Sequence, residues 1–309
     1  MTPLRFDGRT AIITGAGGNP SLGRAHAMLL ASRGANVVVN DIGVSKAPNY
    51  TGQASADAVA EEIRSLGGKA VADTHSVADE DGAAAIIQTA LVSFGSADIL
   101  VNNAGVSIAA AVDEMTPADF RLHIEVNLLG PYYLSRAAWP HMRAAGYGRI
   151  VNITSGSMAG YAQQAAYAAS KGGLWSLTRT LATEGVPLGI KANAVNPGAF
   201  TRMVAATLQD DSPLLEYSRE NLQPELSSPA IAFLAHEDCP VTGECIESVG
   251  GELFRHYMAR TPGCTDRDHG IETLAARWDE IMAGASDGLI ELAGDDTSGW
   301  QVRPYGGSG

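Results

Sequence analysis

The fold is decided by the stretch Thr10-Ala11-Ile12-Ile13-Thr14-Gly15-Ala16-Gly17-Gly18-Asn19-Pro20-Ser21-Leu22-Gly23. Its first five residues form a short apolar strand, and helix-forming residues follow the last glycine, from Arg24 to Ala31. Glycine allows a tight turn and lets the backbone approach a pyrophosphate, whose charge then meets the N-terminus of the helix. A strand, a glycine-rich turn and a helix in this order predict the phosphate-binding unit of a dinucleotide fold.

The next apolar run, Asn36 to Asp41, ends in a carboxylate about 20 residues beyond the glycine turn. A carboxylate in this place accepts hydrogen bonds from both ribose hydroxyls of an adenosine and repels a 2′-phosphate. We therefore predict NAD rather than NADP as the cofactor. Lys46 is the first basic residue after Asp41. The alternative is an aspartate that only caps a turn at the end of its strand.

Helical and strand patterns alternate through the rest of the chain. Strands are expected at 69–75, 98–101, 149–154 and 190–195, with a seventh ending at 247–251, and helices at 54–66, 79–94, 116–146 and 165–182. This alternation implies right-handed crossovers and a parallel sheet covered on both faces, an α/β doubly wound Rossmann sheet of about seven strands. Ligands of such sheets bind outside the carboxyl ends of the strands. Gly15, Asp41, Asn103 and Ser155 all follow strands at that end.

Tyr167-Ala168-Ala169-Ser170-Lys171 places a phenol and an amine four residues apart. Positions i and i+4 share one face of a helix, so both groups are presented to the same point. A free tyrosine has a pKa of about 10, and a nearby cation lowers it by favouring the phenolate. The pair predicts an acid/base group for an alcohol or a carbonyl. The alternative is a helix that carries one tyrosine and one lysine on its surface.

These features together resemble the short-chain dehydrogenase/reductase family over roughly Phe6 to Gly251. The residues that carry the resemblance are Thr14-Gly15 with Gly23, Asn102-Asn103-Ala104-Gly105, Asn127, Ser155, Tyr167 with Lys171, and Asn196-Pro197-Gly198. The resemblance implies an NAD-dependent oxidoreductase that interconverts a secondary alcohol and a ketone. It also implies a small-molecule substrate and assembly into a homodimer or homotetramer.

The resemblance assigns catalysis to Ser155, Tyr167, Lys171 and Asn127. Tyr167 would be the acid/base and Ser155 would hydrogen-bond the reacting oxygen. Lys171 would bind the nicotinamide ribose and lower the pKa of the tyrosine, while Asn127 would hold a water that links Lys171 to solvent. The alternatives are that Ser157 takes the place of Ser155 and that Asn127 only satisfies backbone groups of its own helix.

The resemblance also gives a set of cofactor-binding residues, with Asn103 and Gly105 on the adenosine side and Pro197-Gly198 beside the nicotinamide. The full set is Gly15, Ser21, Leu22, Gly23, Asp41, Ser76, Val77, Asn103, Ala104, Gly105, Tyr167, Lys171, Pro197 and Gly198; no metal ligand is expected. Asn102-Asn103 as plain turn residues are the alternative.

Two positions depart from the pattern of the family. The glycine turn is two residues longer than usual, and Ser21 stands where the second glycine is expected. We expect Asn19-Pro20 to bulge outward, so that Ser21 and Leu22 face the phosphates. Ser76 also stands in the place of the aspartate that usually precedes Val77 in the family and contacts adenine.

A closer resemblance, to the dehydrogenase part of peroxisomal type 2 multifunctional enzymes, bears on the substrate. It rests on five stretches, Val37 to Gly43, Glu61 to Ala70, Ala137-Ala138-Trp139, His236 to Cys239 and Ala276-Arg277-Trp278. Those proteins oxidise (3R)-hydroxyacyl-CoA thioesters with NAD, so a 3-hydroxyacyl-CoA is the expected substrate. A steroid or terpenoid alcohol is the alternative within the class. A nucleotide-binding sensor without turnover is the alternative from another class, although degenerate relatives of that kind usually lose the tyrosine or the lysine.

Composition excludes several other classes of protein. Of the 309 residues, 45% are hydrophobic and 18% charged, which is typical of a globular protein with a sizeable core. The net charge of −13 argues against nucleic-acid and membrane surfaces, and no apolar run reaches the roughly 18 residues of a membrane span. No signal peptide is visible. Cys239, Cys245 and Cys264 are expected to be free thiols in a cytoplasmic protein, with a disulfide as the alternative.

The residues after 251 predict an extension, 252–309, to the main domain, 1–251. An apolar face recurs at helical spacing within 271–283, at Ile271, Leu274, Ala275, Trp278, Ile281 and Met282. The tail 299–309 is expected to be loose. Arg255 and Arg260 are cations in a strongly acidic chain, and guanidinium groups bind phosphates, so we expect them to meet a CoA moiety. The alternative pairs them with acids such as Glu252 and Asp266.

Overall fold

The computed structural model divides into two compact units, residues 1–255 and 256–309. It describes residues 2–43, 55–201, 204–205, 212–261, 263–265, 267 and 270–282, and the backbone of 290–294 and 300–304. Most of the predicted loop 43–52, with Lys46, lies outside these residues. In the part that is described, no helix combines the length and the apolar character needed to cross a membrane.

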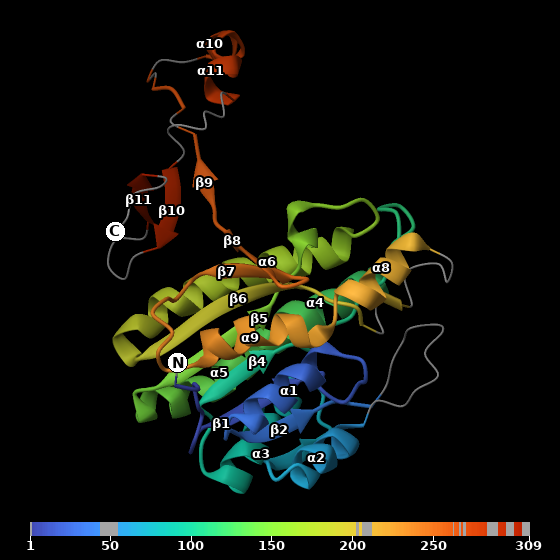
Figure 1. Cartoon of the computed structure of the whole chain (residues 1–309). Coiled ribbons are helices and arrows are strands. Elements are labelled where there is room, and N and C mark those ends of the chain that lie inside the picture. Colours follow the sequence, from blue (N-terminus) through green and yellow to red (C-terminus); the bar gives the residue numbers. More distant parts are fainter. Residues whose placement is uncertain are drawn as a thin grey trace. The chain divides into compact units, whose positions relative to one another are not determined.

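The first unit is built on an eight-stranded sheet in the order β3-β2-β1-β4-β5-β6-β7-β8 (Figure 1). The strands are β1 (Thr10–Thr14), β2 (Asn36–Asn40), β3 (Lys69–Asp73), β4 (Ile99–Asn102), β5 (Gly148–Ile153), β6 (Ile190–Gly198), β7 (Cys245–Val249) and β8 (Glu252–His256). Strands β1 to β7 are parallel to their neighbours. The order reverses on the two sides of β1, which lies between β2 and β4. The predicted α/β doubly wound sheet is therefore confirmed.

The sheet has one strand more than the sequence predicted. After β7 the chain turns through Gly250 and Gly251, whose φ angles are 56° and 88°, and returns as β8 beside β7. Both angles lie in the left-handed region, which glycine adopts without steric cost. The sequence pattern at the same two glycines indicated only the end of the domain, because an eighth strand has no signal within it.

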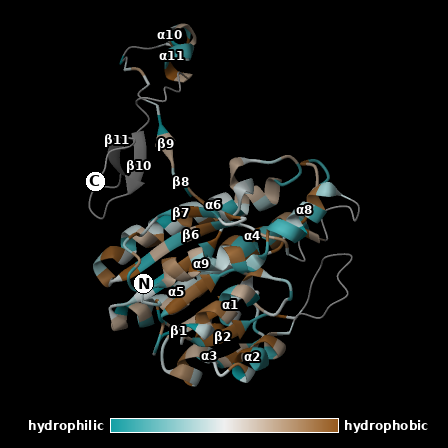
Figure 2. Cartoon of the chain, in the orientation of Figure 1, coloured by the Kyte–Doolittle hydropathy of each residue, from teal (hydrophilic) through white to brown (hydrophobic). Residues whose placement is uncertain are grey.

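Helices cover both faces of the sheet, and the alternation of side chains along the strands explains why. Ile13 points to the face covered by α1 (Leu22–Ser32), α2 (Ala56–Ser65) and α9 (Pro224–Ala235). Ile12 points to the opposite face, which is covered by α3 (Glu80–Phe94), α5 (Gly130–Ala145) and α6 (Ala165–Gly185). Both isoleucines are fully buried, and burying one such side chain stabilises the fold by about 1.5–3 kcal/mol. Figure 2 shows the resulting hydrophobic character of the strands.

The long helix predicted over 116–146 is interrupted. It begins as α4 (Pro117–Ile124), capped by Thr116, passes through one π-helical turn, η1 (Glu125–Leu129), and continues as α5. Within this turn the N–H of Gly130 bonds the carbonyl of Glu125, five residues back. Pro131 has no N–H to give to the carbonyl of Asn127, which an uninterrupted α-helix would require. Asn127 therefore lies in a local irregularity and not in a regular helix.

The second unit also differs from the expectation. It holds a three-stranded sheet, β11-β10-β9, formed by β9 (Ala259–Arg260), β10 (Ile290–Gly294) and β11 (Trp300–Pro304). The single helix expected over 271–283 is two short ones, α10 (Ile271–Ala276) and α11 (Trp278–Met282), separated at Arg277. The segment expected to be loose contains β11, because antiparallel pairing with β10 satisfies its backbone whatever the polarity of its side chains.

Candidate active site

The glycine turn between β1 and α1 leaves room for a ligand backbone because side chains would not fit there. Gly15 has a φ of 64°, and a Cβ on it would lie 2.8 Å from the Cα of Ala104. A Cβ on Gly23 would lie 2.5 Å from the carbonyl oxygen of Gly15. The predicted need for glycine at both positions therefore has a steric cause, and the cradle fits a pyrophosphate at the start of α1.

Asn103 fastens this turn to the end of β4. Its side-chain Nδ2 donates to the carbonyls of Thr14 at 2.8 Å and Gly15 at 3.1 Å. The Thr14 hydroxyl in turn accepts the N–H groups of Asn103 at 3.1 Å and Ala104 at 3.0 Å. Asn103 therefore shapes the predicted cofactor site by holding the glycine turn.

The lengthened turn directs its extra residues outward. Asn19 and Pro20 are exposed, whereas Ser21 is the N-cap of α1. The Ser21 hydroxyl accepts the N–H of Arg24 at 3.1 Å and donates to the carbonyl of Gly18 at 2.9 Å. The oxygen thus stabilises the helix start, where a serine at N-cap is worth about 1 kcal/mol over alanine. Phosphate contacts from Ser21 and Leu22 stay a prediction.

Asp41 follows β2 and faces the same turn. One of its carboxylate oxygens accepts the N–H of Gly17 at 2.9 Å and the other the N–H of Gly43 at 2.9 Å. A Cβ on Gly17 would lie 2.8 Å from the Cβ of Asp41, so the carboxylate lies against the turn. Beyond β3, the Ser76 hydroxyl accepts the N–H of Ala78 at 3.0 Å, and Val77 is buried.

Tyr167 and Lys171 lie on α6, one turn apart, as the spacing predicted. The Lys171 side chain is 3% exposed, and its Nζ donates to the carbonyl of Ile153, the last residue of β5, at 2.6 Å. The same nitrogen lies 5.7 Å from the centroid of the Tyr167 ring. A Cβ on Gly105, three residues after β4, would lie 3.7 Å from this nitrogen and 3.3 Å from the side-chain oxygen of Asn127.

The electrostatics of the pair differ from the prediction. Burial raises the pKa of Tyr167 above its ordinary value, and a hydrogen bond with Ser155 acts in the opposite direction. Burial also lowers the pKa of Lys171, to about 8. The predicted net lowering of the tyrosine pKa by Lys171 does not occur here, because desolvation disfavours both the phenolate and the ammonium. Each group therefore tends towards its neutral form.

Ser155 follows β5 and is the N-cap of a short 3₁₀ helix, η2 (Gly156–Ala159). Its hydroxyl accepts the N–H of Ser157 at 3.2 Å and donates to the Ser157 hydroxyl at 3.1 Å. Ser157 is 5% exposed, and Ser155 acts to lower the pKa of Tyr167, against the effect of burial. The choice of Ser155 over Ser157 stays a prediction.

The Asn127 side chain holds the loop after β4. Its amide oxygen accepts the N–H of Val106 at 2.9 Å, and its amide nitrogen donates to the carbonyl of Val106 at 2.9 Å and the hydroxyl of Ser170 at 3.2 Å. It is fully buried. The alternative in which Asn127 serves its own helix is therefore wrong in detail, because its partners lie in the loop and in α6.

One buried residue of this region was not predicted. His123, in α4, lies with its ring edge-to-face against Tyr167, with 6.2 Å between the ring centroids. Its Nε2 accepts the N–H of Ile108 at 3.0 Å. The available signal was its spacing of four from Asn127, which places both on one face of a helix. On the other side of the site, Pro197 and Gly198 end β6, and a Cβ on Gly198 would lie 2.3 Å from a methyl group of Val249.

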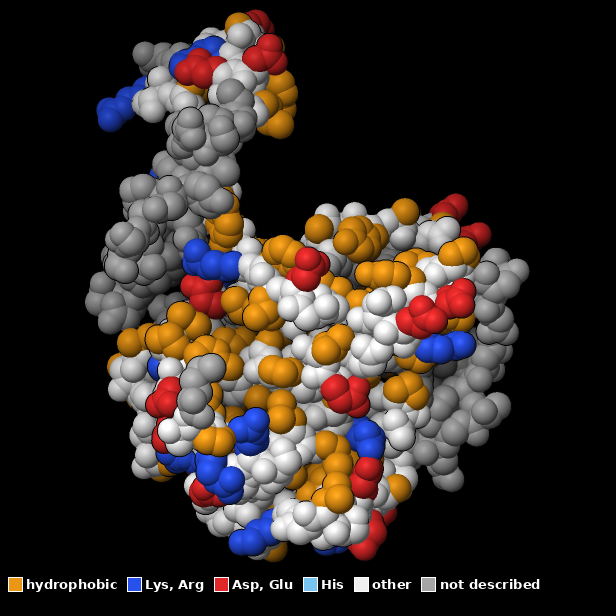
Figure 3. Space-filling model, in the orientation of Figure 1, with side chains coloured by type: hydrophobic (Ala, Val, Ile, Leu, Met, Phe, Trp, Pro, Cys, Tyr) orange, Lys and Arg blue, Asp and Glu red, His pale blue; other side chains and the backbone are white. Residues whose placement is uncertain are grey.

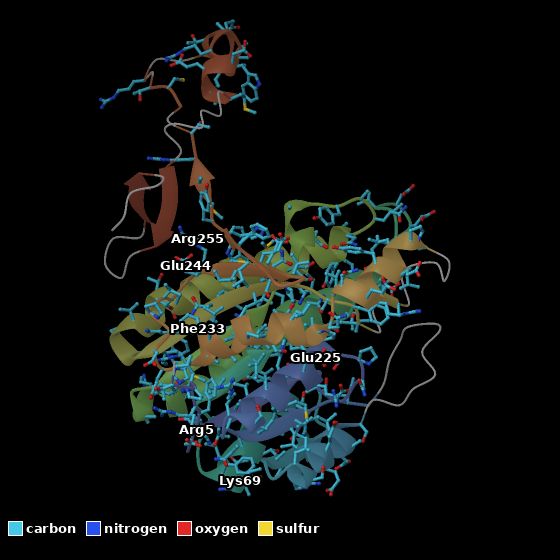
Figure 4. The ribbon with its side chains drawn as sticks, in the orientation of Figure 1. Arg5, Lys69, Glu225, Phe233, Glu244 and Arg255 are labelled. Carbon is cyan, nitrogen blue, oxygen red and sulfur yellow. The ribbon has the colours of Figure 1, made fainter. Side chains whose placement is uncertain are left out.

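A groove of about 890 Å³ runs along α1, and its lining includes Arg5, Lys69 and Glu225 (Figure 4). It holds none of the predicted site residues. Figure 3 shows basic, acidic and hydrophobic side chains interspersed on this view of the protein. Among the described residues, no group of three or more histidine, cysteine or acidic side chains is placed to hold a metal ion, and the three cysteines are free.

A parallel sheet with a glycine cradle, and with a tyrosine one helical turn from a buried lysine at its carboxyl ends, defines the class of dinucleotide-dependent α/β oxidoreductases. Residues 9–212 match the family model described as short chain dehydrogenase. The chain therefore belongs to the short-chain dehydrogenase/reductase family. It is an oxidoreductase that acts on CH–OH groups with NAD or NADP.

The chain is similar to a short-chain type dehydrogenase/reductase of Mycobacterium tuberculosis, with 42% identity over 281 residues that cover 90% of this chain and 96% of the relative. It is 40% identical over 265 residues to the peroxisomal multifunctional enzyme type 2 of Drosophila melanogaster, covering 85% of this chain and 42% of that enzyme. The chain thus spans less than half of the fly protein.

Two further comparisons cover nearly the whole length of the relative. The cis-4-hydroxycyclohexanecarboxylate dehydrogenase of Sinomonas cyclohexanicum is 37% identical over 253 residues, which cover 80% of this chain and 96% of that enzyme. A crystal structure of a short chain dehydrogenase from Mycobacterium avium superimposes with a TM-score of 0.77 at 36% identity, covering 91% of this chain and 97% of that one.

Proposed function

We propose that this protein oxidises the hydroxyl group of a 3-hydroxyacyl-CoA thioester to a ketone with NAD. The observation that carries the alcohol chemistry is the grouping of Tyr167 and Ser155, both half-buried, with the buried Lys171 at the carboxyl end of β5. NAD, when bound, supplies the acceptor for the hydride. The substrate class rests on the similarity to the peroxisomal multifunctional enzyme type 2.

Tyr167, as the phenolate, takes the proton of the substrate hydroxyl, and Ser155 holds the reacting oxygen by a hydrogen bond. Because burial raises the pKa of Tyr167, the phenolate is the minor form at neutral pH, so alcohol oxidation speeds up as the pH rises. We infer that the proton leaves past Lys171 through a water held at the Asn127 carbonyl. Pro131 has no N–H for that carbonyl, so a lone pair stays available for water.

The preference for NAD rests on Asp41. Its carboxylate is 8% exposed and is held by two backbone N–H groups beside the glycine turn. Each carboxylate oxygen has a second lone pair for a ribose hydroxyl. The 2′-phosphate of NADP in the same place would be repelled by this carboxylate, because its two hydrogen bonds hold it against the glycine turn.

Arg255 has a partner within the protein, which bears on the predicted contacts of Arg255 and Arg260 with CoA. Arg255 makes a two-point ion pair with Glu244, at 2.7 and 3.0 Å (Figure 4). The predicted alternative named Glu252 and Asp266 as partners, and Asp266 lies outside the described residues. The Arg255 side chain is exposed and that of Glu244 is half-buried, so solvent partly screens the ion pair and a phosphate can compete for the guanidinium. A role of Arg255 and Arg260 in CoA binding stays a prediction.

The test is NADH formation with (3R)-3-hydroxybutyryl-CoA, with its (3S) epimer and with CoA-free (3R)-3-hydroxybutyrate. We expect kcat/KM for the (3R) thioester to exceed that for the free acid by at least about tenfold, or ~1.4 kcal/mol. No turnover of any CoA ester would exclude the substrate class. If the protein binds NAD but turns over no secondary alcohol, the alternative of a nucleotide-binding sensor without turnover is favoured.

The role of the two arginines is tested in the same assay by the double variant Arg255→Ala, Arg260→Ala. A rise in KM for the thioester, without a rise for the free acid, supports it. Arg64→Ala is the matched control, because the Arg64 side chain has the same exposure, 44%, and is also paired with a glutamate. If both variants change KM equally for both substrates, Arg255 and Arg260 do not bind the CoA moiety.

A second candidate substrate is a ring alcohol. The similarity to the cis-4-hydroxycyclohexanecarboxylate dehydrogenase covers 96% of that enzyme, whereas the match to the fly enzyme covers 42% of it. It favours the alternative of a cyclic secondary alcohol, to which steroids and terpenoids belong. cis-4-Hydroxycyclohexanecarboxylate in place of the thioester tests it, with the trans isomer as control.

A further inference from the structure

We propose that His123 is a positioning residue of the active site, which fixes the loop after β4 and the ring of Tyr167 relative to each other. The proposal rests on the catalytic role proposed for Tyr167. It concerns a residue that has no part in the predicted catalytic set and that touches neither the glycine turn nor Asp41 by any contact described above.

The hydrogen bonds of His123 decide which nitrogen of its ring carries the proton. The side chain is fully buried. Its Nε2 accepts the backbone N–H of Ile108 at 3.0 Å, so this nitrogen carries a lone pair. The proton of the neutral ring is therefore on Nδ1, which donates to the carbonyl of Asp119 at 2.7 Å. Both nitrogens are used, and each holds a backbone group, one in the loop and one in α4.

His123 and Asn127 together form a clamp on the loop. They lie four residues apart, on one face of the segment formed by α4 and η1. Asn127 holds the N–H and the carbonyl of Val106 at 2.9 Å each, and His123 holds the N–H of Ile108. Val106 and Ile108, two residues apart in the loop, are thus hydrogen-bonded to Asn127 and His123, which lie one turn apart in the helical segment.

The clamped loop leads directly to the catalytic tyrosine. The N–H of Ala110 donates to the carbonyl of Gln163 at 2.9 Å, and Ala110 forms a parallel bridge with Gln164, three residues before Tyr167. The His123 ring lies against the Tyr167 ring at 75° between planes. One imidazole therefore holds the loop by its Nε2 and limits the tilt of the tyrosine by its edge-to-face contact.

The expected consequence is on the rate and not on cofactor affinity. A misplacement of about 1 Å in a catalytic group can cost on the order of 100-fold in rate. The elements that cradle the cofactor are tied by Asn103 and Thr14, independently of His123. Loss of the Ile108 bond should thus lower kcat while NAD binding is kept.

Another histidine provides a matched control for a purely structural role. His236 is 4% exposed, its Nδ1 accepts the N–H of Asp238 at 3.1 Å, and its Nε2 donates to the carbonyl of Arg5 at 3.0 Å. Its ring lies edge-to-face on Phe6, with centroids 5.1 Å apart. The contacts are of the same kind, but they lie away from Tyr167.

The experiment compares four variants. His123→Gln places an oxygen where Nε2 was and keeps the acceptor for Ile108. His123→Asn can replace the Nδ1 donor but does not reach Ile108. His123→Phe keeps only the ring, and His236→Phe makes the same change at the control position. The readouts are kcat and KM with (3R)-3-hydroxybutyryl-CoA, the Kd of NAD, Tm, and amide hydrogen exchange of a peptide covering residues 105–111.

We expect His123→Asn and His123→Phe to lower kcat by about 10- to 100-fold, with the Kd of NAD within about threefold of wild type and faster exchange at 105–111. His123→Gln should restore slow exchange at 105–111, because it keeps the acceptor for Ile108, but it should recover only part of kcat, because it lacks the ring that lies against Tyr167. His236→Phe should lower Tm while kcat below Tm stays within about twofold. Equal kcat and exchange in the Asn and Gln variants would overturn the proposal, as would losses of kcat that follow Tm at both positions.

The Asn and Gln variants decide the matter if His123→Phe does not fold. The exchange measurement separates this proposal from the proposed function, because it needs no substrate. A wild type that binds NAD but oxidises no alcohol would refute the function, while unchanged exchange at 105–111 in His123→Asn would refute the clamp.

Discussion

Each end of the same sheet places a half-buried tyrosine beside a cation, but the two cations differ in how the protein holds their charge. At the amino ends of the strands, Tyr147 lies between the guanidinium groups of Arg9 and Arg149, at 3.6 and 4.3 Å from the ring centroid. At the carboxyl ends, Tyr167 lies near the Lys171 amine. Burial raises the pKa of both tyrosines.

The cations differ in how fully the protein satisfies them. Arg149 donates to four carbonyls, those of Gly148 at 2.8 Å, Gly189 at 3.2 Å, His236 at 3.2 Å and Glu237 at 3.5 Å. Lys171 donates to one, that of Ile153, and its pKa falls to about 8. Arginine keeps its proton in every protein environment, whereas a buried lysine can release it. The cation at the amino ends of the strands, Arg149, therefore stays charged. The cation at the carboxyl ends, Lys171, can lose and regain its proton.

The largest difference should appear when each tyrosine loses its hydroxyl. Tyr167→Phe keeps the ring but removes the proton relay, so we expect turnover to fall by about 10³-fold or more with NAD binding retained. Tyr147→Phe should leave turnover within about twofold. Steady-state assays and NAD titration of both variants check this, and near-normal turnover of Tyr167→Phe would remove the tyrosine from the mechanism.

The next effect is on stability at the amino ends. Arg149→Met removes four hydrogen bonds to carbonyls, two of them buried and two part-buried. At about 1 kcal/mol for each buried bond and less for the others, the free energy of unfolding should fall by about 2–4 kcal/mol. Activity per folded molecule should stay unchanged. Urea unfolding, with turnover measured below the transition, checks both, and a stability loss under about 1 kcal/mol would contradict the role given to Arg149.

The exchangeable proton of Lys171 predicts a pH dependence of stability. Its pKa is about 8 in the folded state, against an ordinary value of 10.5 for an exposed lysine. Between these values the unfolded chain binds a proton that the native chain does not, so the free energy of unfolding rises with pH by about 3 kcal/mol in total. Lys171→Met should lack this rise. Unfolding curves at pH 7 to 11 test it, and equal slopes in both proteins would be inconsistent with a buried, depressed lysine.

The smallest effect concerns the choice of cofactor at the carboxyl end of β2. Asp41 should favour NAD over NADP by at least about tenfold in kcat/KM, or ~1.4 kcal/mol. Asp41→Asn keeps nearly the same side-chain shape and removes the charge, so it should lower the ratio of kcat/KM with NAD to kcat/KM with NADP. Kinetics with both cofactors decide, and equal efficiency of the wild type with NAD and NADP would show that Asp41 does not select.

Much of the fold could be read from local patterns. The strand at Thr10–Thr14 and the helix starts at Asp79 and Thr116 depend on neighbours within a few residues, which the sequence displays directly. The grouping of Tyr167, Lys171 and Ser155 follows from one helical spacing and from the rule that strands of a parallel sheet present their carboxyl ends together. These parts needed no knowledge of long-range contacts.

Other features depended on partners that lie far away in the sequence. Burial by the surrounding elements, and not the sequence neighbour Lys171, sets the direction of the Tyr167 pKa. His123 acts through Ile108, and Arg255 pairs with Glu244 across the turn at Gly250. By itself the sequence determined which chemical groups are present and which elements carry them. Only the tertiary structure decided their protonation, their partners and the π turn at Asn127, because desolvation and hydrogen bonds between distant segments arise only when the chain has packed.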